Sequence, residues 1–556
     1  MFINKQFNDV EVLWEGLKSI IIDSTKSCVP PSDSGSWKKK ASWQHPINKD
    51  LQNLIKRKHR LWARYQETKD KKYEAEFKKL RNMVRKETRK VSSRFQQEIA
   101  ASCKQNPKKF WRYVNSKTKS FKPVGNITVI NERSGYCCVL ESDIDKANAF
   151  SEYFMKVCSI NSFITDVSVN IIMPPNSMPD ITISENSINL KLQKLKSNTS
   201  PGPDNIHPRV LHELKDVISP HLKSIYEQSL IDGKIPVDWN HSSITVIHKK
   251  GKKSSIENYR PISLTCVACK VLESIIRDQL MYYFKSNALF SNCQYGFING
   301  RSVALQLLKI VDDWCSCLDK GHQVDVIYTD FEKAFDKVPH GCLLGKLYSY
   351  GVNEKLIKWI SAFLCYRTQC VKINGVSSDE HKVLSGIPQG SVLGPLLFVI
   401  FINDLPDVCT NLSKLFMFAD DAKLYRELNC IADSVELNQN IQDVFNWSKK
   451  CGMKLNASKC KSLSIIKNKN NKQDYEYSFC DSDGKVVVLE HVSSMKDLGV
   501  TMDADLTFSI HIYEKINKAF QMLGIINRNF SDLDKFSFLL LYKSFVRSRV
   551  EYSRSV

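Results

Sequence analysis

The sequence lacks the long apolar run that a membrane-spanning protein needs. A membrane-spanning helix takes about 20 consecutive apolar residues, and the longest such run here, residues 396–402, is far shorter. No signal peptide is apparent, and no internal repeat divides the chain. We therefore expect an intracellular protein of the nucleus and cytoplasm with no membrane partner, and 556 residues suffice for two to four domains.

Regular cysteine spacing is also missing. The 18 cysteines are scattered irregularly, which argues against a disulfide framework. Cys266 and Cys269 form a lone C-x-x-C with no second pair nearby, so we interpret them as buried thiols on a helix and not as a zinc site. Reduced thiols are the rule in cytosolic and nuclear proteins.

Acidic residues are scarce in one stretch of this basic chain, whose formal net charge is +21. Residues 49–122 hold 24 Lys and Arg against 7 Asp and Glu, with aromatic residues such as Trp62 and Trp111 between them. Apolar residues recur there at helical spacing. The pattern fits either a nucleic-acid-binding helical arm or a solvated helix face over a small helical core.

Two adjacent carboxylates, Asp420 and Asp421, interrupt an apolar stretch that reads as a hairpin between buried strands. Like charges raise each other's pKa, and a divalent cation relieves that repulsion. A lone Asp-Asp pair is more often a solvated turn. Ninety residues upstream, however, the β-branched segment 323–330 reads as a strand that ends in Asp330, with a helix expected to start at residues 331–336. Two strands that converge on one metal pair suit two-metal phosphoryl or nucleotidyl transfer.

Seven short motifs then point to a family. In order they are residues 258–264 (NYRPISL), 294–297 (QYGF) with 300–302 (GRS), 330–336 (DFEKAFD), 385–395 (SGIPQGSVLGP), 418–421 (FADD), 455–459 (LNASK) and 496–500 (KDLGV). With them the chain resembles the reverse transcriptases of non-LTR retrotransposons, LINE-type and jockey-like in particular. The resemblance is firm from about residue 200 to 510.

The resemblance implies an α+β right-hand polymerase, with an antiparallel palm sheet, fingers and a partial helical thumb. The domains would be a basic helical arm (1–122), an extension leading to the fingers (123–229), fingers and palm (230–502) and thumb (503–556). We expect no endonuclease module and a truncated thumb, as in a partial element or an incomplete gene model.

The implied function is RNA-directed DNA polymerisation with two Mg²⁺ ions, for which Mn²⁺ can substitute. RNA template, DNA primer or target, and dNTPs would be the partners; the oligomeric state stays open. The alternative is a decayed or domesticated relative that binds RNA without activity. The retained aspartates argue against it, whereas the missing endonuclease and short thumb argue for a non-mobile remnant.

The resemblance also implies the site residues. Asp330 and Asp420 would bridge the metals, with Asp421 as a weaker ligand and the Phe331 carbonyl completing one shell. Nucleotide contacts would come from Lys249, Lys250, Arg260, Phe335, Gln389 and Lys459, and template or primer contacts from Arg301, Gly390, Lys496 and Gly499. Phe335, the expected wall against a ribose 2′-OH, could instead be core, and Lys459, a possible general acid, could be merely solvated.

Three positions depart from the family's pattern. Phe418 replaces a frequent tyrosine, and Ile298 replaces a frequent arginine. Asp497 stands where an aromatic residue is common in the primer-grip turn, which puts primer positioning in doubt.

Overall fold

The structure, a computed structural model, describes residues 9–29, 48–103, 105–118, 124–130, 137–158, 176–197, 199–409, 412–467, 472–481, 484–530 and 533–556. The residues fall into two units, each packed mainly within itself. The first unit is Met1–Pro30, Pro123–Leu506 and Ser555–Val556, and the second is Pro31–Lys122 and Thr507–Arg554. Together they mix helices and sheets, as expected of an α+β protein.

The first unit contains a five-stranded sheet, here called the aspartate sheet, in the order β14-β11-β5-β10-β9. All its pairs are antiparallel except β11 with β14. The strands are β5 (Gln323–Thr329), β9 (Lys414–Phe418), β10 (Asp421–Leu428), β11 (Lys461–Ile465) and β14 (Glu490–His491). β5 is buried at every position but its last, which explains its apolar, β-branched sequence.

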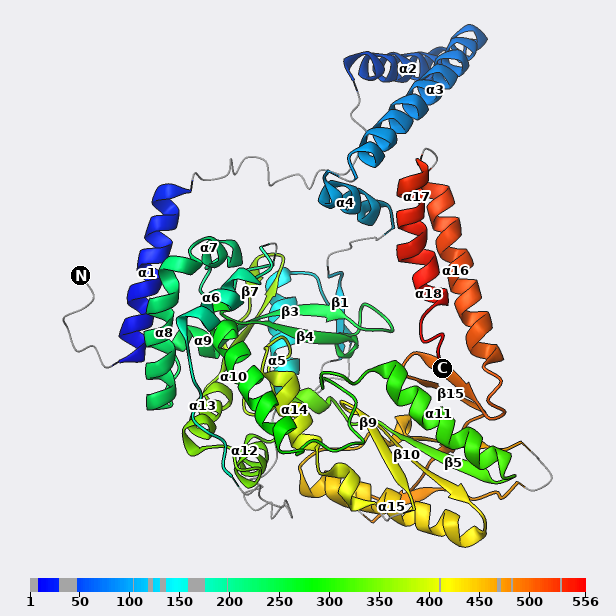
Figure 1. Ribbon diagram of the computed structural model, residues 1–556. Helices are drawn as coiled ribbons and strands as arrows, with labels where there is room; N and C mark the ends of the chain where they lie inside the picture. Colours follow the sequence, from blue (N-terminus) through cyan, green and yellow to red (C-terminus); the bar gives the residue numbers. More distant parts are fainter. Residues whose placement is uncertain are drawn as a thin grey trace. The chain divides into compact units, whose positions relative to one another are not determined.

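Helices cover both faces of the aspartate sheet (Figure 1). Tyr425 points to α11 (Val303–Asp319), where its ring meets Trp314. The next residue, Arg426, pairs with Asp433 of α15 (Ile431–Lys450). Because neighbouring strand residues point to opposite faces, α11 and α15 lie on opposite sides of the sheet.

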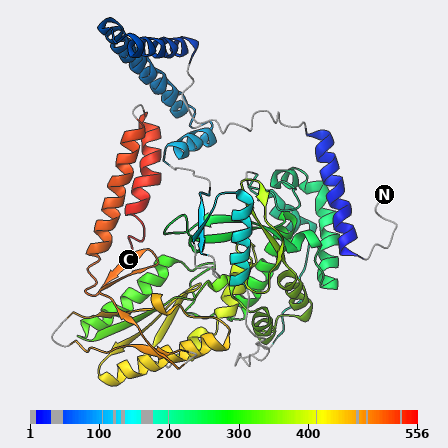
Figure 2. The same cartoon turned by 180° about the vertical axis from the view of Figure 1, so that it is seen from behind.

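A second sheet has the order β4-β3-β6-β7, with β8 also paired to β6. Its strands are β3 (His241–His248), β4 (Tyr259–Leu264), β6 (Thr368–Ile373), β7 (Val376–Ser377) and β8 (His381–Lys382). Helix α5 (Asp143–Val157) lies against β6, as Figure 2 shows from behind. The small hairpin of β1 (Ile127–Ile130) and β2 (Cys137–Leu140) adds Ile127 to the apolar core beneath α5.

The remaining helices of the first unit build its large core. They are α1 (Val10–Cys28), α6 (Glu185–Gln193), α7 (Pro208–Glu213), α8 (Lys215–Asp232), α9 (Val237–Asn240), α10 (Val267–Ser286), α12 (His340–Ser349), α13 (Glu354–Cys365) and α14 (Gly394–Ile402). The apolar run 396–402 lies in α14 and is fully buried. Within the described ranges, no helix has the length and apolar character required to cross a bilayer.

Three short segments complete the first unit near the aspartate sheet. β12 (Ser478–Cys480) pairs with β13 (Val486–Val488), and β15 (Ser494–Asp497) pairs with β16 (Val500–Asp503). The 3₁₀ turn η5 (Ala457–Lys459) leads into β11.

The second unit is helical and joins segments from both ends of the chain. α2 (Lys49–Thr68) and α3 (Lys71–Ala101) form a hairpin, followed by α4 (Pro107–Thr118). From the other end come α16 (Ser509–Asn529), α17 (Lys535–Leu541), a π-helical turn η7 (Tyr542–Arg547) and α18 (Ser548–Val550). One apolar core includes side chains of α3, α4, α16 and α17. The sequence predicts separate domains for these segments, and those boundaries stay predictions.

One helix end was not predicted, and one local expectation was wrong. The sequence predicts long helices over residues 47–102 but not where one ends; the break falls at Lys69, whose left-handed backbone (φ 54°) ends α2. No α-helix starts at residues 331–336; instead Lys333 is left-handed (φ 49°), and a 3₁₀ turn, η3 (Ala334–Asp336), follows. The left-handed residue prevents helical continuation there.

Candidate active site

The three predicted metal-binding aspartates come together at one end of the aspartate sheet. β9 and β10 pair Phe418 with Asp421, which leaves a two-residue turn of Ala419 and Asp420. β5 pairs Thr329 with Ala422, so the antiparallel register places Asp330 opposite Asp421. The predicted hairpin and strand end are therefore confirmed in their local geometry.

Electrostatics supports a shared site for these carboxyl groups. Burial and then the charge of Asp330 raise the pKa of Asp420. Burial, followed by the charges of Asp420 and Asp330, raises the pKa of Asp421 to about 6. Asp420 and Asp421 therefore both experience the charge of Asp330 at a partly desolvated site, which is costly without a counter-ion.

The donor set fits a hard divalent cation, which carboxylate oxygens bind in preference to other ligands. In the described part of the chain, no group of three or more His, Cys, Asp or Glu side chains is already arranged around one metal position. A cation is nevertheless present on one carboxylate, because Lys459 Nζ donates to Asp330 Oδ2 at 2.5 Å. The Asn456 amide donates to the Asp330 carbonyl at 2.7 Å, and this bond holds the η5 turn that carries Lys459.

Phe331 is fixed between two backbone hydrogen bonds. Besides the Asn456 bond, the Glu332 amide donates to the Lys454 carbonyl at 2.8 Å. The Phe331 ring is buried and meets Trp447 edge-on, at 6.3 Å between ring centroids. These contacts fix the backbone next to Asp330, whereas the proposed role of the Phe331 carbonyl stays a prediction.

Cations from the second sheet face the aspartates. Lys249 follows β3, and Arg260 lies on β4 opposite Ile247. Burial and the positive charges of Arg260, Lys459 and Lys250 lower the pKa of Lys249, while the charge of Asp330 opposes that shift. Lys249 and Arg260 in turn oppose the raised pKa of Asp420. The four predicted phosphate-binding cations therefore share one electrostatic field with the carboxylates.

The SGIPQG loop (residues 385–390) contacts β4 of the second sheet and the η3 turn that follows β5. Gln389 Nε2 donates to Asp336 Oδ1 at 2.8 Å, and the Gln389 carbonyl accepts from the Ser263 amide at 2.7 Å. Gly390 has φ 123°, and a Cβ there would lie 2.6 Å from the Ser263 carbonyl oxygen. The second glycine of the loop is thus required by close backbone packing.

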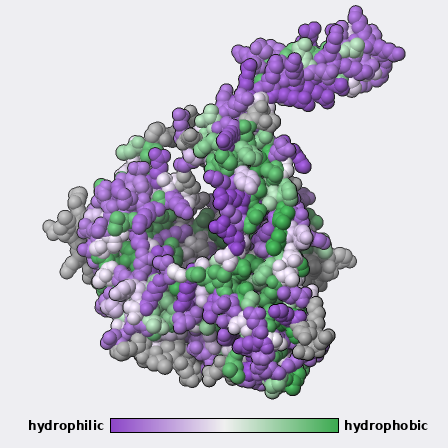
Figure 3. All heavy atoms as spheres, turned by 45° about the vertical axis from the view of Figure 1, so that its right-hand side comes forward, coloured by the Kyte–Doolittle hydropathy of each residue, from purple (hydrophilic) through white to green (hydrophobic). Residues whose placement is uncertain are grey.

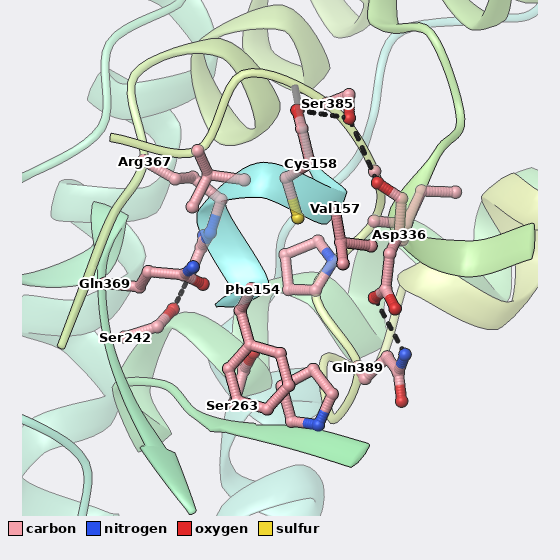
Figure 4. Close-up of a pocket in the computed structure, with 15 residues that line it drawn as sticks. Phe154, Val157, Cys158, Ser242, Ser263, Asp336, Arg367, Gln369, Ser385 and Gln389 are labelled. Carbon is pink, nitrogen blue, oxygen red and sulfur yellow. Dashed lines mark hydrogen bonds between the residues drawn. The ribbon is translucent and has the colours of Figure 1, made fainter. Parts of the chain in front are cut away.

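A small polar cavity of about 30 Å³, room for one or two waters, lies behind this loop (Figure 4). The buried guanidinium of Arg367 donates to Ser242 Oγ at 2.5 Å on one side. On the other side Ser385 Oγ donates to the carbonyl of Asp336 at 3.0 Å. Asp336 is therefore a hydrogen-bonding residue of this cavity, and its pKa is raised, mainly by burial.

Phe335 is part of the apolar packing beside the site. Its ring stacks on Phe398 of α14, at 4.3 Å between centroids and 19° between planes. The half-buried ring also meets the edge of Phe297, which is half exposed. One face is therefore core packing, and the wall against a 2′-OH stays a prediction.

Sequence reasoning missed two residues that hold the aspartate turn. Gln294 is fully buried, and its Oε1 accepts from the Ala419 amide at 3.0 Å and from the Gly296 amide at 2.7 Å. A Cβ on Gly296 would lie 2.4 Å from the Ala419 nitrogen. The QYGF motif was visible in the sequence, but no local pattern revealed which turn it supports.

The predicted template and primer residues lie in three places, of which the SGIPQG loop with Gly390 is described above. The Arg301 guanidinium donates to the carbonyls of Ser291 (2.6 Å) and Gln294, so it braces the QYGF segment. Lys496 is exposed on β15, and Gly499 is left-handed (φ 91°) in the β15–β16 turn. Contacts of any of these with nucleic acid stay predictions.

Comparisons with known proteins agree with the motifs. The family model described as "Reverse transcriptase (RNA-dependent DNA polymerase)" matches residues 247–524, half of the chain. The RNA-directed DNA polymerase from mobile element jockey of Drosophila melanogaster is 27% identical over 417 residues, which cover 73% of this chain and 44% of the relative. A probable RNA-directed DNA polymerase from transposon BS of the same species is 28% identical over 385 residues, covering 66% and 40%.

The chain thus spans about two fifths of the length of these relatives. Among solved structures, apo telomerase from Candida tropicalis, truncated from its C-terminal domain, aligns with 50% of this chain and 55% of its own. The sequence identity is 14% and the TM-score is 0.35.

Proposed function

The chain belongs to the reverse transcriptase (RNA-dependent DNA polymerase) family, and we propose that it copies RNA into DNA as the polymerase of a non-LTR retrotransposon. The reaction would transfer a nucleotidyl group from a dNTP to the 3′-OH of a DNA primer. One observation carries the proposal: Asp330 and Asp421 stand opposite each other on paired strands, beside Asp420 and in the field of Lys249 and Arg260.

Members of this family use divalent metal ions, and we assign two Mg²⁺ ions to this site, with Mn²⁺ able to substitute. Asp330 and Asp420 would hold both, Asp421 would be an outer ligand, and the Phe331 carbonyl would complete one shell. When bound, the ions supply activation of the primer oxygen and neutralisation of charge on the triphosphate. Release of Lys459 from Asp330 would make room for them.

The other residues would bind and orient the nucleotide. Arg260 and Lys249 suit the triphosphate, the first as a bidentate donor and the second as a point charge. Lys459, once released, stands where it could protonate the leaving pyrophosphate. Gln389 would contact the nucleotide and template, and Phe335 would exclude the ribose 2′-OH.

In this proposal the aspartate sheet is the palm, the second sheet belongs to the fingers, and α16 to α18 form part of the thumb. An RNA template and a DNA primer or target are the partners. Priming from a nicked chromosomal 3′-OH would place the reaction in the nucleus, after synthesis of the protein in the cytoplasm.

The test is primer extension on poly(rA) with oligo(dT), as Mg²⁺ is titrated and then removed with EDTA. The wild-type chain should incorporate dTTP only with the metal. Asp420→Asn should lower the rate on the order of 10³-fold or more, because a ligand to both metals is removed. Asp216→Asn, an exposed aspartate on α8, is the matched control and should extend normally.

The outcomes separate the two functions considered. Metal-dependent extension that is abolished in Asp420→Asn supports the polymerase. RNA binding without extension at any Mg²⁺ or Mn²⁺ concentration would instead support a binding protein derived from a polymerase. Wild-type extension by Asp420→Asn would contradict the assignment of the metal ligands.

A further inference from the structure

A buried ion pair joins the β15–β16 turn to the strand that carries the aspartate turn. Lys423 Nζ on β10 pairs with Asp497 Oδ2 at the end of β15. The two side chains are 2% and 4% exposed, respectively. A pair this well buried holds its partners at a fixed separation, because neither charge can leave the other without a large desolvation penalty.

The strand end of this pair lies next to the candidate active site. Lys423 is two residues after Asp421, so both side chains leave β10 on the same face. In register, Lys423 lies opposite Tyr328 of β5 and Phe416 of β9. The charges of Lys423 and Asp497 both act on the Asp421 carboxyl group, which confirms that the pair is close to it.

Asp497, next to the β15–β16 turn, is also held in a constrained position. Asp497 pairs with Val500 across a two-residue turn in which Leu498 and Gly499 are both left-handed, at φ 46° and 91°. Two left-handed residues are the signature of a type I′ turn, a rigid hairpin connection. The neighbouring Lys496 is exposed, so the hairpin presents a cation next to its anchored residue.

We propose that the Lys423–Asp497 pair is a positioning device, which sets the distance between the β15–β16 turn and the aspartates and thereby aligns the 3′ end of the primer. The inference rests on the proposed polymerase function. When the primer 3′-OH is at the aspartates, the primer's last phosphates must lie along the neighbouring protein surface. The β15–β16 turn, held by the ion pair and carrying the exposed Lys496, suits contact with those phosphates, because phosphate contacts fix the position of a strand without reading its sequence.

The Lys423–Asp497 pair compensates for the unusual residue at position 497. Asp497 replaces an aromatic residue in the turn, which by itself suggested weaker primer positioning. The structure gives the carboxylate a different partner, because it faces inward to Lys423. Tyr328 lies beside the pair, and its buried hydroxyl has no hydrogen-bond partner among the described residues. The pair is therefore a polar link between the hairpin and the sheet.

The experiment compares three changes in the full-length chain. Asp497→Asn removes one charge at nearly constant volume. Asp497→Glu keeps the charge. The double variant Lys423→Met with Asp497→Met removes both charges, and it should recover thermal stability, because an apolar pair can replace a buried ion pair without loss. Asp238→Asn is the control, since it breaks the part-buried Lys18–Asp238 pair between α1 and α9, away from the site.

Melting temperature, kcat and the KM values for dTTP and primer–template are measured for each variant. Asp497→Asn should lower kcat about tenfold and leave the KM for dTTP within twofold. Asp497→Glu should regain most of that loss. The double variant should melt like the wild type yet extend as slowly as Asp497→Asn, and the control should melt earlier with unchanged kcat. Recovery of kcat together with melting temperature in the double variant would reduce the pair to a purely structural role.

Hydrogen exchange makes the test independent of activity. In Asp497→Asn, amides of residues 494–503 should exchange at least tenfold faster, while those of β5 keep their protection. An inactive wild-type chain would refute the proposed function. Unchanged exchange in residues 494–503 of Asp497→Asn would refute the proposal that the Lys423–Asp497 pair anchors the β15–β16 turn.

Discussion

The aspartate turn and the α2–α3 hairpin use charge in opposite ways. At the turn, three aspartates from distant parts of the chain lie close together, so that the charge of Asp330 raises the pKa of Asp420, and the charges of both raise the pKa of Asp421. On the hairpin, many Lys and Arg side chains are exposed along two helices, and most of the face seen in Figure 3 is hydrophilic there. Catalysis at the turn would therefore depend on the positions of a few carboxylates, whereas RNA binding by the hairpin, which stays a prediction, would depend on its total charge.

The aromatic residues of the basic segment 49–122 divide between two roles. Trp62 packs against Phe77, at 4.7 Å between centroids, and is still 42% exposed. Trp111 instead lies against the core of the second unit, near Phe545. Of these two tryptophans, Trp62 is the one accessible enough to stack on a base. The helical-core interpretation therefore holds for Trp111, and base stacking by Trp62 stays a prediction.

The largest effect is expected where the turn is most tightly packed. Gly296→Ala would place a Cβ 2.4 Å from the Ala419 nitrogen, and the turn must move to make room. A displacement near 1 Å at reacting groups lowers rates on the order of 10²-fold. We expect a loss of that size in primer extension at saturating dTTP, measured below the melting temperature.

Gly345→Ala in α12 is the control for this change. A Cβ there meets no atom within 4 Å, and alanine favours the helix, so extension and stability should be kept or improved. Wild-type extension by Gly296→Ala would show that the turn tolerates movement and that exact position matters less there than its packing suggests.

The next prediction concerns how repulsion between the clustered carboxylates affects the free energy of unfolding. Because the folded-state pKa of Asp421 is raised to about 6, the folded chain holds that proton more tightly than the unfolded chain. Its contribution to stability is complete below about pH 4 and is lost as pH rises through 6. In EDTA at pH 8, Asp421→Asn should therefore unfold with a free energy greater by about 1 kcal/mol, because the carboxylate is partly exposed and solvent screens part of the repulsion.

Urea unfolding at pH 4 and pH 8 checks this expectation. The variant and wild type should have equal free energies of unfolding at pH 4. At pH 8, Mg²⁺ should reduce the difference between their free energies of unfolding. The exposed Asp216, whose pKa is lowered by its hydrogen bonds to Asn189 and Lys215, should show the opposite sign when changed to Asn. A gap at pH 8 that Mg²⁺ leaves unchanged would argue against metal binding at Asp421.

A smaller effect is expected at the edge of the site. Phe335→Ala opens space beside the proposed sugar position without removing a metal ligand, so incorporation of rUTP relative to dTTP should rise about tenfold, or roughly 1.4 kcal/mol. The stack on Phe398 is removed as well, and stability should fall. Competition between the two nucleotides in single-step extension gives the ratio.

Phe445→Ala provides the comparison, because Phe445 stacks on Phe479 away from the site. It should lose stability with no change in the nucleotide ratio. If Phe335→Ala behaves in the same way, its ring is core packing alone.

The smallest effect per residue is expected on the hairpin. Four exposed cations of α2 are replaced by Gln: Lys56, Arg57, Arg60 and Arg64. Each phosphate that the protein no longer neutralises lowers the log–log salt slope of single-strand binding by about 0.7. RNA affinity at low salt should fall and the slope should flatten, while kcat at saturating template stays the same.

Filter binding at several salt concentrations measures both quantities. The matched variant replaces four exposed lysines of the first unit, Lys194, Lys196, Lys355 and Lys358. Equal slopes for the two variants would mean that the hairpin carries no special share of RNA binding.

The sequence predicted features that depend on local pattern. β5 and the β9–β10 hairpin could be predicted because apolar strands end in polar turns, and their Asp residues then had to share an end of the sheet. The α2–α3 helices could be predicted from periodicity, although the break at Lys69 could not, since no glycine or proline marks it.

What escaped prediction depends on contacts between distant segments. No local pattern links Lys423 to Asp497, and only the folded chain buries them together. Gln294 supports a turn 125 residues away, for which no local spacing gives a signal. Phe335 could not be assigned because one ring can both fill a core and line a site.

The shared core of the second unit imposes an order in time on the synthesis of the chain. Gln96 donates to the carbonyl of Asn529, and α4 packs with α16 across a comparable separation in sequence. A ribosome that adds 5–20 residues per second needs roughly 20 to 90 s to cover that interval. For that period the apolar side of the first segment stays without its partner. The second unit can therefore close only after almost the whole chain has been made.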